Sequence, residues 1–581
     1  MLFVPLCLAA ETVSPEVAKK IAGGLLWANG CPSQQVRQVV EPQFMTKASL
    51  MGDPYYIFEG DRGGFVILSA DDRLSPVIGW SRDNGFPEEC EPANLRAWMD
   101  MWGNIVDAMR SGRLEPQKGA SAQWEDYKNG KYLSYGTGKM LETAKWNQGS
   151  PYNMYCPSVG GMLSVTGCVA TATAILMRYH QWPEAGEGDL PSYDYTDDNG
   201  NTQSVSGLTL GNVYDWENMP LTVDDNTPEE SKKQIARLMA DLGIMLQSQY
   251  NPGGTGAYSS DIPVGLMEYF FYDKSCAYYF KDYYSDAEWT QMICDNIDNV
   301  GPVIFSASSK EGGHAFILDG YSAAGQISIN WGWGGNGNGM YTYPAFDDFT
   351  DNHAMVTGLK KDEGGSYKEI LVIDGNGKAN GFTSETTEFE VDVPFNTEIK
   401  TVFNMGLNTF TGYIALGVMH RDGSLGEIVD GYIEEDDLVT INPWYGKSFS
   451  TVETVITEPI RIGDRLCIWF RSENTPEWTP MPGNQEDGET HSYIQIADPQ
   501  SIEEVTSFRY TSSSGELVIS TKPDAQWSIT DAEGNEYTDG ITFDEGVLTI
   551  MTKTFPLQSY FITLSKKDDV KTVEFVYGLE E

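Results

Sequence analysis

The hydrophobic period changes once along this chain, and no other feature limits its fold as strongly. In the first half, apolar residues recur at the spacing of an α-helix. The segments with this spacing are 17–28, 95–109, 168–180 and 231–249, and Ser285 and Glu288 form a capping-box pattern that opens another helix. From about residue 366 apolar and polar residues alternate instead, as in 465–470. A mixed block followed by a block of strands predicts an α+β N-terminal half and C-terminal β-sandwich domains.

These patterns divide the chain into five predicted segments: 1–10, 11–125, 126–362, 366–498 and 500–581. The first is apolar and ends in small residues, as the tail of a secretory signal peptide does. The second contains a predicted β-hairpin, 55–58 with 65–68, between two helices. The polar, glycine-rich stretch Ser111–Lys139 carries scattered basic residues and is predicted to be a linker open to proteolysis.

Charge and composition exclude several classes of function. Lys and Arg number 38 against 84 Asp and Glu, a net charge of −46, which argues against nucleic acid or an anionic membrane as the partner. Hydrophobic residues make up 40% of the chain, so it is not a disordered chain. No apolar run is long enough to span a bilayer. The chain has no His-x-x-x-His or Cys-x-x-Cys pair and no phosphate-binding glycine loop, so we expect no metal and no cofactor.

Cys168 stands at the start of an apolar helix of small residues, directly after Gly167. The positive end of the helix dipole and the unpaired backbone N–H groups stabilise a thiolate there and lower its pKa. Gly167 leaves room for another backbone to approach. Taken alone, the pattern fits a buried core cysteine better than a nucleophile, so the nucleophile hypothesis needs a partner.

His314 is such a partner. It follows two glycines and enters an apolar strand, where it can face a cleft. A thiol and an imidazole together form the nucleophile and the general acid/base of acyl transfer. Trp331 can pack on that imidazole, and Gln148 can donate to a developing oxyanion together with the Cys168 backbone N–H. The alternatives are a surface histidine, a core tryptophan and an ordinary glutamine.

Four blocks follow one another in the order Gln, Cys on a helix, His on a strand, and Trp: 146–153, 167–172, 313–321 and 330–335. They closely resemble the streptopain family of papain-like cysteine peptidases, and 55–72 resembles the propeptide of that family. The resemblance covers about residues 11–360. It implies a secreted bacterial endopeptidase made as a zymogen, with an inhibitory propeptide at 11–125 and a papain-like catalytic domain at 126–362.

The resemblance also implies roles for single residues. Cys168 matches the nucleophile, His314 the general acid/base, Gln148 the oxyanion-hole donor, and Trp331 the ring that orients and shields the histidine. The implied substrate-binding residues are Gly313, Ser260, Gly334 and Gly335, the last two in a mobile glycine-rich loop, 334–339, beside the cleft. Asn330 immediately precedes Trp331, so alternation along a strand points it to the other face, and any role beside the histidine is left open.

These features predict hydrolysis of peptide bonds through a Cys168–His314 dyad and an acyl-thioester, in an enzyme activated by removal of its propeptide. The resemblance implies protein or peptide substrates with an apolar residue second before the scissile bond, and the propeptide as intramolecular inhibitor. No nucleic acid and no membrane span are expected. The expected location is the cell surface or exterior of a bacterium, and the last segment loosely resembles sorting domains of Bacteroidetes. Two alternatives remain: a papain-fold amidase or transpeptidase for cell-wall peptides, and a non-catalytic surface adhesin.

Overall fold

The computed structural model describes most of the chain, with gaps that are more frequent toward the C-terminus. The described residues are 13–32, 35–39, 52–87, 93–133, 138–309, 312–343, 353–374, 381–386, 389, 391–429, 438–449, 451–458, 463–473, 475, 477–486, 489–491, 493–495, 506–511, 516–521, 525–532, 534–541, 546–551, 559–566 and 569–576. The predicted signal-peptide remnant, 1–10, lies outside them. Within these ranges, no helix combines the length and the apolar character needed to cross a membrane.

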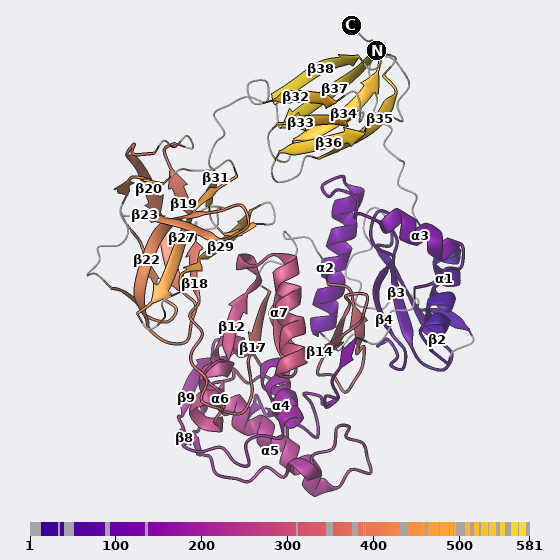
Figure 1. Ribbon diagram of the computed structural model, residues 1–581. Coiled ribbons are helices and arrows are strands. Elements are labelled where there is room, and N and C mark those ends of the chain that lie inside the picture. The colour runs from indigo at the N-terminus through magenta and orange to yellow at the C-terminus, as the bar shows by residue number, and fades with distance from the viewer. Residues whose placement is uncertain are drawn as a thin grey trace.

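One antiparallel sheet runs through both N-terminal units (Figure 1). In the described residues its strands lie in the order β1 (Val36–Gln38), β2 (Tyr55–Gly60), β3 (Phe65–Ser69), β4 (Val77–Ser81), β16 (Gly339–Tyr341), β15 (Ile327–Asn330), β14 (Gly312–Tyr321), β13 (Val303–Ser309), β17 (Ala354–Thr357) and β12 (Ala277–Phe280), and β5 (Lys139–Met140) pairs with β14. The two units join where β4 pairs with β16, with Trp80 opposite Met340. The N-terminal unit therefore extends the sheet of the second unit.

Three helices belong to the N-terminal unit: α1 (Pro15–Ala28), α2 (Ala93–Arg110) and α3 (Ala120–Lys128). Ser14 caps α1 by accepting a hydrogen bond from the Val17 N–H, and a proline occupies the first turn, where no N–H is needed. The buried stripe of α1, which includes Ile21 and Leu25, shares one core with β2 and β3. This is the amphipathic spacing expected from the sequence.

Helix α3 lies inside the stretch that composition predicts to be a linker. Its Trp124 and Tyr127 are buried in the same core as α1, and the Trp124 indole N–H donates to the Leu74 carbonyl at 2.9 Å. Composition missed this helix because only two of its large side chains are apolar, and both find their partners far away in the sequence. The segment from Ala120 to Lys128 is therefore packed against the N-terminal unit.

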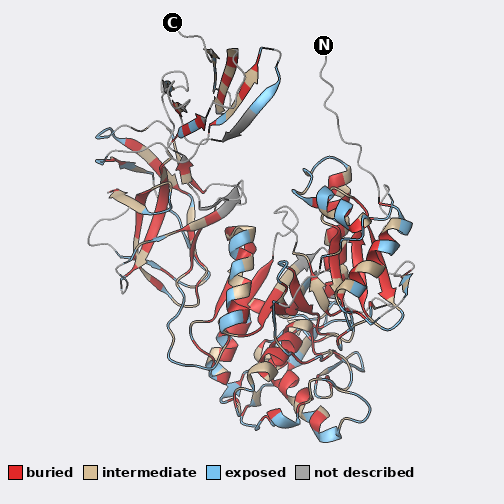
Figure 2. Cartoon of the chain, turned by 45° about the vertical axis from the view of Figure 1, so that its right-hand side comes forward, coloured by how far each residue is buried: buried red, intermediate tan, exposed pale blue. Residues whose placement is uncertain are grey.

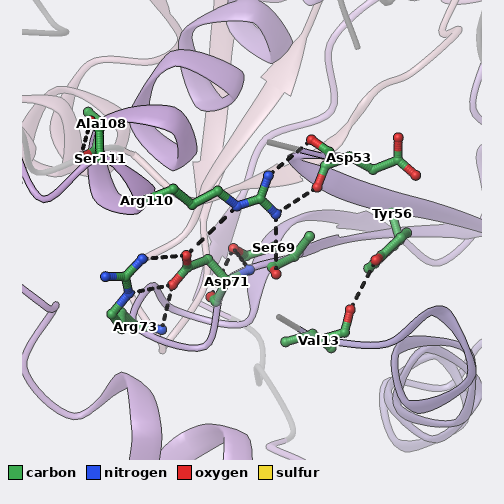
Figure 3. Close-up of polar contacts among 11 residues, drawn as sticks. Val13, Asp53, Tyr56, Ser69, Asp71, Arg73, Ala108, Arg110 and Ser111 are labelled. Carbon is green, nitrogen blue, oxygen red and sulfur yellow. Dashed lines mark hydrogen bonds and ion pairs between the residues drawn. The ribbon is translucent and has the colours of Figure 1, made fainter. Parts of the chain in front are cut away.

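A buried ion-pair network fixes the C-terminal end of α2 (Figure 3). The Asp71 carboxylate, which is 1% exposed, pairs with Arg73 at 2.8 Å and with Arg110 at 3.9 Å. Arg110 also donates to the backbone carbonyls of Gly52 and Asp53, at 3.0 and 2.8 Å. A cation in the last turn complements the helix dipole. Helix α2 is thus held at a defined position on the hairpin that precedes it.

The second unit contributes the helices α4 (Cys168–His180), α5 (Glu229–Met245), α6 (Ile262–Phe270) and α7 (Asp286–Asn299). Its short elements are β6 (Ser158–Val159), β7 (Met162–Leu163), β8 (Asp189–Leu190), β9 (Tyr193–Thr196), β10 (Thr202–Val205), β11 (Leu208–Thr209) and the 3-10 turns η1 (Trp216–Asn218), η2 (Ser259–Asp261) and η3 (Lys281–Tyr283). The capping box predicted at Ser285 and Glu288 is confirmed at the start of α7.

Alternation along β14 separates two apolar cores. Ala315 and Ile317 belong to the core that contains α4, α5 and α6. Phe316 and Leu318 belong to the core that contains α7 and also α2 of the N-terminal unit. Successive side chains of a strand point to opposite faces, so α2 covers the sheet face opposite α4. Figure 2 shows the buried strands, in red, between these helices.

After residue 366 the described residues contain strands and no helix, as the alternating pattern predicts. The first group is β18 (Leu371–Asp374), β19 (Phe382–Ser384), β20 (Phe395–Ile399), β21 (Thr401–Asn404), β22 (Phe410–Met419), β23 (Leu425–Val429), β24 (Val439–Ile441), β25 (Gly446–Lys447), β26 (Val452–Thr454), β27 (Arg465–Ser472), β28 (Thr479–Pro480), β29 (Pro482–Glu486), β30 (Glu489–His491) and β31 (Tyr493–Gln495). The second is β32 (Ser507–Thr511), β33 (Glu516–Ser520), β34 (Gln526–Asp531), β35 (Glu536–Ile541), β36 (Val547–Met551), β37 (Ser559–Lys566) and β38 (Asp569–Val576). Each group packs its sheets around a separate apolar core, which confirms the α+β fold with C-terminal β domains.

Asp273 ties the second unit to the segment that leads into the β domains. Its carboxylate accepts backbone hydrogen bonds from Ser275 at 2.8 Å, Glu363 at 2.9 Å and Gly365 at 3.1 Å. Burial alone would raise the pKa of Asp273, but the hydrogen bonds from Ser275, Glu363 and Gly365 outweigh it and hold the pKa well below its usual range.

Candidate active site

The structure places Cys168 where the sequence predicts, at the first position of α4. Gly167 precedes it with φ of 88°, and a Cβ there would stand 2.7 Å from the Thr255 carbonyl oxygen, so only glycine fits. The Ala315 N–H of β14 donates to the Cys168 Sγ at 3.4 Å. Burial raises the pKa of the thiol, while N–H groups of Ala315 and Val169 act in the opposite direction. The net direction is a raised pKa, opposite to the expectation from the helix dipole.

His314 directly precedes Ala315, so the sulfur of the predicted nucleophile contacts the backbone of the residue next to the predicted acid/base. His314 pairs with Ala307 of β13 and is half-buried. Alternation places its side chain on the face of Phe316, which is the face that α2 covers. Gly313, one residue earlier, is exposed at the start of the strand.

Gln148 lies beside the cysteine through its backbone. Its carbonyl accepts a hydrogen bond from the Thr166 N–H at 3.0 Å, two residues before Cys168, and its own N–H donates to the Asn147 side chain at 2.7 Å. Gln148 is 6% exposed. The hydrogen bond from Thr166 thus ties the backbone of the predicted oxyanion-hole donor to the loop that carries the thiol.

Trp331 follows β15 and is completely buried. Its ring centroid lies 4.8 Å from that of Phe316, and its indole N–H donates to the Gly337 carbonyl at 3.1 Å. Trp331 therefore packs on the side chain two residues after His314, on the same face of β14.

The remaining predicted residues surround this point. The Gly334 N–H donates to the Trp146 carbonyl at 2.9 Å, and Gly335 follows in the same turn with φ of 89°. Ser260 lies in η2 and is half-buried. Its neighbour Ser259 accepts a hydrogen bond from Ser306 of β13 at 2.7 Å, which ties η2 to the strand beside β14. The predicted site residues come from five separate segments of the sequence, and their roles stay predictions.

Sequence reasoning missed the residues that the N-terminal unit brings to this site. The Asn94 side chain donates to the Trp331 carbonyl at 2.7 Å in a buried contact. The Trp98 ring stands edge-on to the Trp331 ring, with centroids 6.1 Å apart, and is 4% exposed. The helical pattern places Trp98 on an apolar face, but no pattern in the sequence names the surface that this face meets.

His353 is a further residue that sequence reasoning passed over. It is 3% exposed and stacks on Trp98, with ring centroids 6.3 Å apart and planes 7° from parallel. Its Nδ1 lies 2.9 Å from the Tyr343 hydroxyl. Burial, and then the charge of Lys281, lower the pKa of His353 to about 3. A neutral imidazole is therefore buried at the contact between α2 and the second unit.

No group of three or more His, Cys, Asp or Glu side chains in the described ranges is placed to hold a metal ion. The chemistry available at the site is that of its own side chains: a thiol, an imidazole and amide donors.

Comparison with known proteins gives two family matches. Residues 146–341 match the peptidase C10 family, and residues 10–106 match the Spi protease inhibitor family. The first match contains Cys168, His314 and Trp331, and the second contains α1, Asn94 and Trp98.

Among individual proteins, the chain is 32% identical over 287 residues to a thiol protease/hemagglutinin, PrtT, of Porphyromonas gingivalis, covering 48% of this chain and 32% of that protein. It is 29% identical over 301 residues to streptopain of Streptococcus pyogenes, covering 49% of this chain and 72% of that protein. A solved fragment of prointerpain A from Prevotella intermedia is 28% identical, with a TM-score of 0.45 over 56% of this chain and 98% of that one. The chain thus spans about a third of the Porphyromonas protein that it matches.

Proposed function

Because the chain belongs to the peptidase C10 family over residues 146–341, we propose that it is a cysteine endopeptidase produced as a zymogen. The observation that carries the proposal is the meeting of Cys168, at the start of α4, with the strand residue next to His314. A thiol at a helix N-terminus, next to a strand that carries a histidine, supplies the two groups that acyl transfer needs.

In the proposed reaction, the Cys168 sulfur attacks the carbonyl carbon of the scissile peptide bond, and its proton passes to His314. The Gln148 side chain and the Cys168 backbone N–H stabilise the resulting oxyanion. When the C–N bond breaks, His314 gives the proton to the leaving amine, and an acyl-thioester remains on Cys168. Water then attacks this thioester with His314 as the base, and the thiol is restored.

We propose that the N-terminal unit is the inhibitor of its own enzyme. It matches the Spi protease inhibitor family, and it contributes Asn94 and Trp98 to the surroundings of Trp331. Helix α2 also covers the face of β14 on which His314 lies. A covalently attached unit acts at a high effective concentration, so modest contacts suffice to keep the site closed.

The boundary between propeptide and enzyme is proposed between Leu133 and Gly138, later than the predicted 125/126. The Leu133 carbonyl accepts a hydrogen bond from Asn29 at the end of α1, which anchors it to the N-terminal unit. A Cβ at Gly138 would stand 2.2 Å from the Tyr321 carbonyl oxygen, and β5 pairs with β14, so this end lies against the second unit. These two anchored ends support a maturation cleavage between them, and N-terminal sequencing of the mature chain tests this.

Secretion, protein or peptide substrates and an apolar preference at the second residue before the scissile bond are part of the same proposal. They rest on the sequence resemblance and on a bacterial relative, PrtT of Porphyromonas gingivalis, that is named a thiol protease. The signal-like start of the chain and its net charge of −46 agree with an exported protein. We propose that the two β domains are accessory modules that extend the enzyme from the cell surface.

The test uses wild type, Cys168→Ala and Cys294→Ala, a matched substitution of another partly buried cysteine. Each full chain is incubated with casein and dithiothreitol, and the mass of both proteins is followed. We expect casein loss and shedding of about 130 residues in wild type and Cys294→Ala, and neither in Cys168→Ala. Casein loss in Cys168→Ala would overturn the proposal. Cleavage of cell-wall muropeptides but not casein would favour the amidase alternative.

A further inference from the structure

Asn330, the last residue of β15, is 2% exposed and uses its whole amide group in buried hydrogen bonds. Its Nδ2 donates to the Thr143 Oγ1 at 3.0 Å and to the Ala144 carbonyl at 2.9 Å. Its Oδ1 accepts from the Gly332 N–H at 3.2 Å. Both amide hydrogens are therefore directed at residues 143 and 144, and neither is available to the imidazole of His314.

Thr143 passes this contact on to a buried carboxylate. Since the Thr143 Oγ1 accepts from Asn330, its own proton points to the Asp319 Oδ2, 2.5 Å away. Asp319 lies on β14 and is 7% exposed. The chain of donors runs in one direction, from Asn330 through Thr143 to Asp319, and joins β15 and β14 to the segment that begins at residue 143.

That segment ends at Gln148. Between its two ends, the Trp146 carbonyl accepts from the Gly334 N–H at 2.9 Å. At its far end, the Gln148 carbonyl accepts from Thr166, whose hydroxyl bonds to that of Thr171 on α4 at 2.7 Å. The segment 143–148 is therefore held at one end by the sheet and at the other by the helix of Cys168.

We propose that Asn330 is a positioning residue of the peptidase, which acts through Thr143 and Asp319 to hold Gln148 at the oxyanion site. The inference rests on the proposed function and assigns Asn330 to the oxyanion hole, not to the orientation of His314. A displacement of a catalytic group by about 1 Å can reduce the rate about 100-fold. For Asn330→Ala we expect kcat to fall about 10- to 100-fold with KM changed by less than about threefold, because positioning matters most in the transition state.

The experiment compares two reactions of Cys168 in the matured enzyme. A peptide aldehyde adds to the sulfur and places its oxygen where the oxyanion forms, so its affinity reports on the oxyanion hole. Iodoacetamide alkylates the same sulfur with loss of iodide and forms no oxyanion, so its rate and pH profile report on the thiol and imidazole. We expect Asn330→Ala and Thr143→Val to weaken aldehyde inhibition by about the factor lost in kcat. The alkylation rate and its pH profile stay at wild-type values.

Thr143→Ser keeps the hydroxyl and is expected to restore aldehyde affinity and kcat. The matched control is Asn296→Ala, which removes a buried amide that donates to the Gly301 carbonyl and accepts from the Gly358 N–H at the end of α7. It should lower the unfolding temperature but leave both reactions unchanged. Slower alkylation in Asn330→Ala would instead show that Asn330 orients His314. Unchanged aldehyde affinity would show that Asn330 has a purely structural role. Either result overturns the inference. A wild-type enzyme that reacts with neither reagent at Cys168 would overturn the proposed function itself.

Discussion

Replacing Trp98 by alanine should release the enzyme from its propeptide. Within the described part of the chain, the aromatic neighbours of this ring all belong to the second unit: Phe316, Trp331, Tyr341, Tyr343 and His353. The substitution therefore removes contacts that exist only while the propeptide is docked.

The size of the effect follows from the burial of the ring. Trp98 is 4% exposed, and truncation of a buried tryptophan to alanine costs about 3–5 kcal/mol. At about 1.4 kcal/mol for each tenfold change, the fraction of undocked zymogen rises by roughly two to almost four powers of ten. Trp98→Phe keeps a ring and loses an indole N–H without a described partner. Its fraction of undocked zymogen should lie between those of wild type and Trp98→Ala.

The assay is the lag before full-length protein hydrolyses a fluorogenic peptide, together with the initial rate at which iodoacetamide labels Cys168. We expect a shorter lag and faster labelling of Cys168 in Trp98→Ala than in wild type. The control is Trp27→Ala on α1, where the ring is 77% exposed, and its lag should match wild type. A folded Trp98→Ala zymogen with an unchanged lag and labelling rate would refute the assignment of α2 as the inhibitory contact.

Three further predictions concern pH, the glycine before the thiol and the domain junction. Since folding lowers the pKa of His353 from 6.5 to about 3, the unfolded chain binds more protons, and zymogen stability should fall as pH drops from about 6.5 toward 3. His353→Gln should flatten this loss in urea titrations of the Cys168→Ala zymogen. Gly167→Ala should abolish peptidase activity and lower the free energy of unfolding by about 1–3 kcal/mol. The control is Gly161→Ala, which should retain activity. Gly161 also has a positive φ, of 81°, but no described atom lies within 4 Å of the new Cβ. Asp273→Ala should remove about 1–3 kcal/mol of stability and admit proteolysis near residue 363, while Asp362→Ala should not.

The sequence predicted those parts of the molecule in which a local pattern determines the structure. The apolar, small-residue pattern of 168–180 predicted α4 with Cys168 at its first position, and the alternation after residue 366 predicted strands. The likeness to the streptopain family, carried by four short blocks, is confirmed by the family match over 146–341.

What sequence reasoning could not reach depends on pairing between distant segments. Alternation predicts that Asn330 points to the other face of its strand, but nothing in the sequence pointed to its partners, Thr143 and Ala144. The pairing of Trp80 with Met340 likewise joins two units that the hydrophobic pattern of the sequence predicts to be separate. Helix α3 was missed because its few apolar residues are buried by tertiary contacts, which override a polar local composition.

The shared sheet has a consequence for the enzyme after maturation. Removing β1–β4 shortens the described sheet from eleven strands to seven and leaves β16 as a new edge. An exposed edge strand offers unpaired N–H and C=O groups to any passing extended chain, and short edges limit this hazard. Strand β16 is only three residues long, and its last residue, Tyr341, is held by a hydrogen bond from its hydroxyl to the Gly337 carbonyl at 2.6 Å. The activated enzyme thus gains an edge too short to template the association of its own copies.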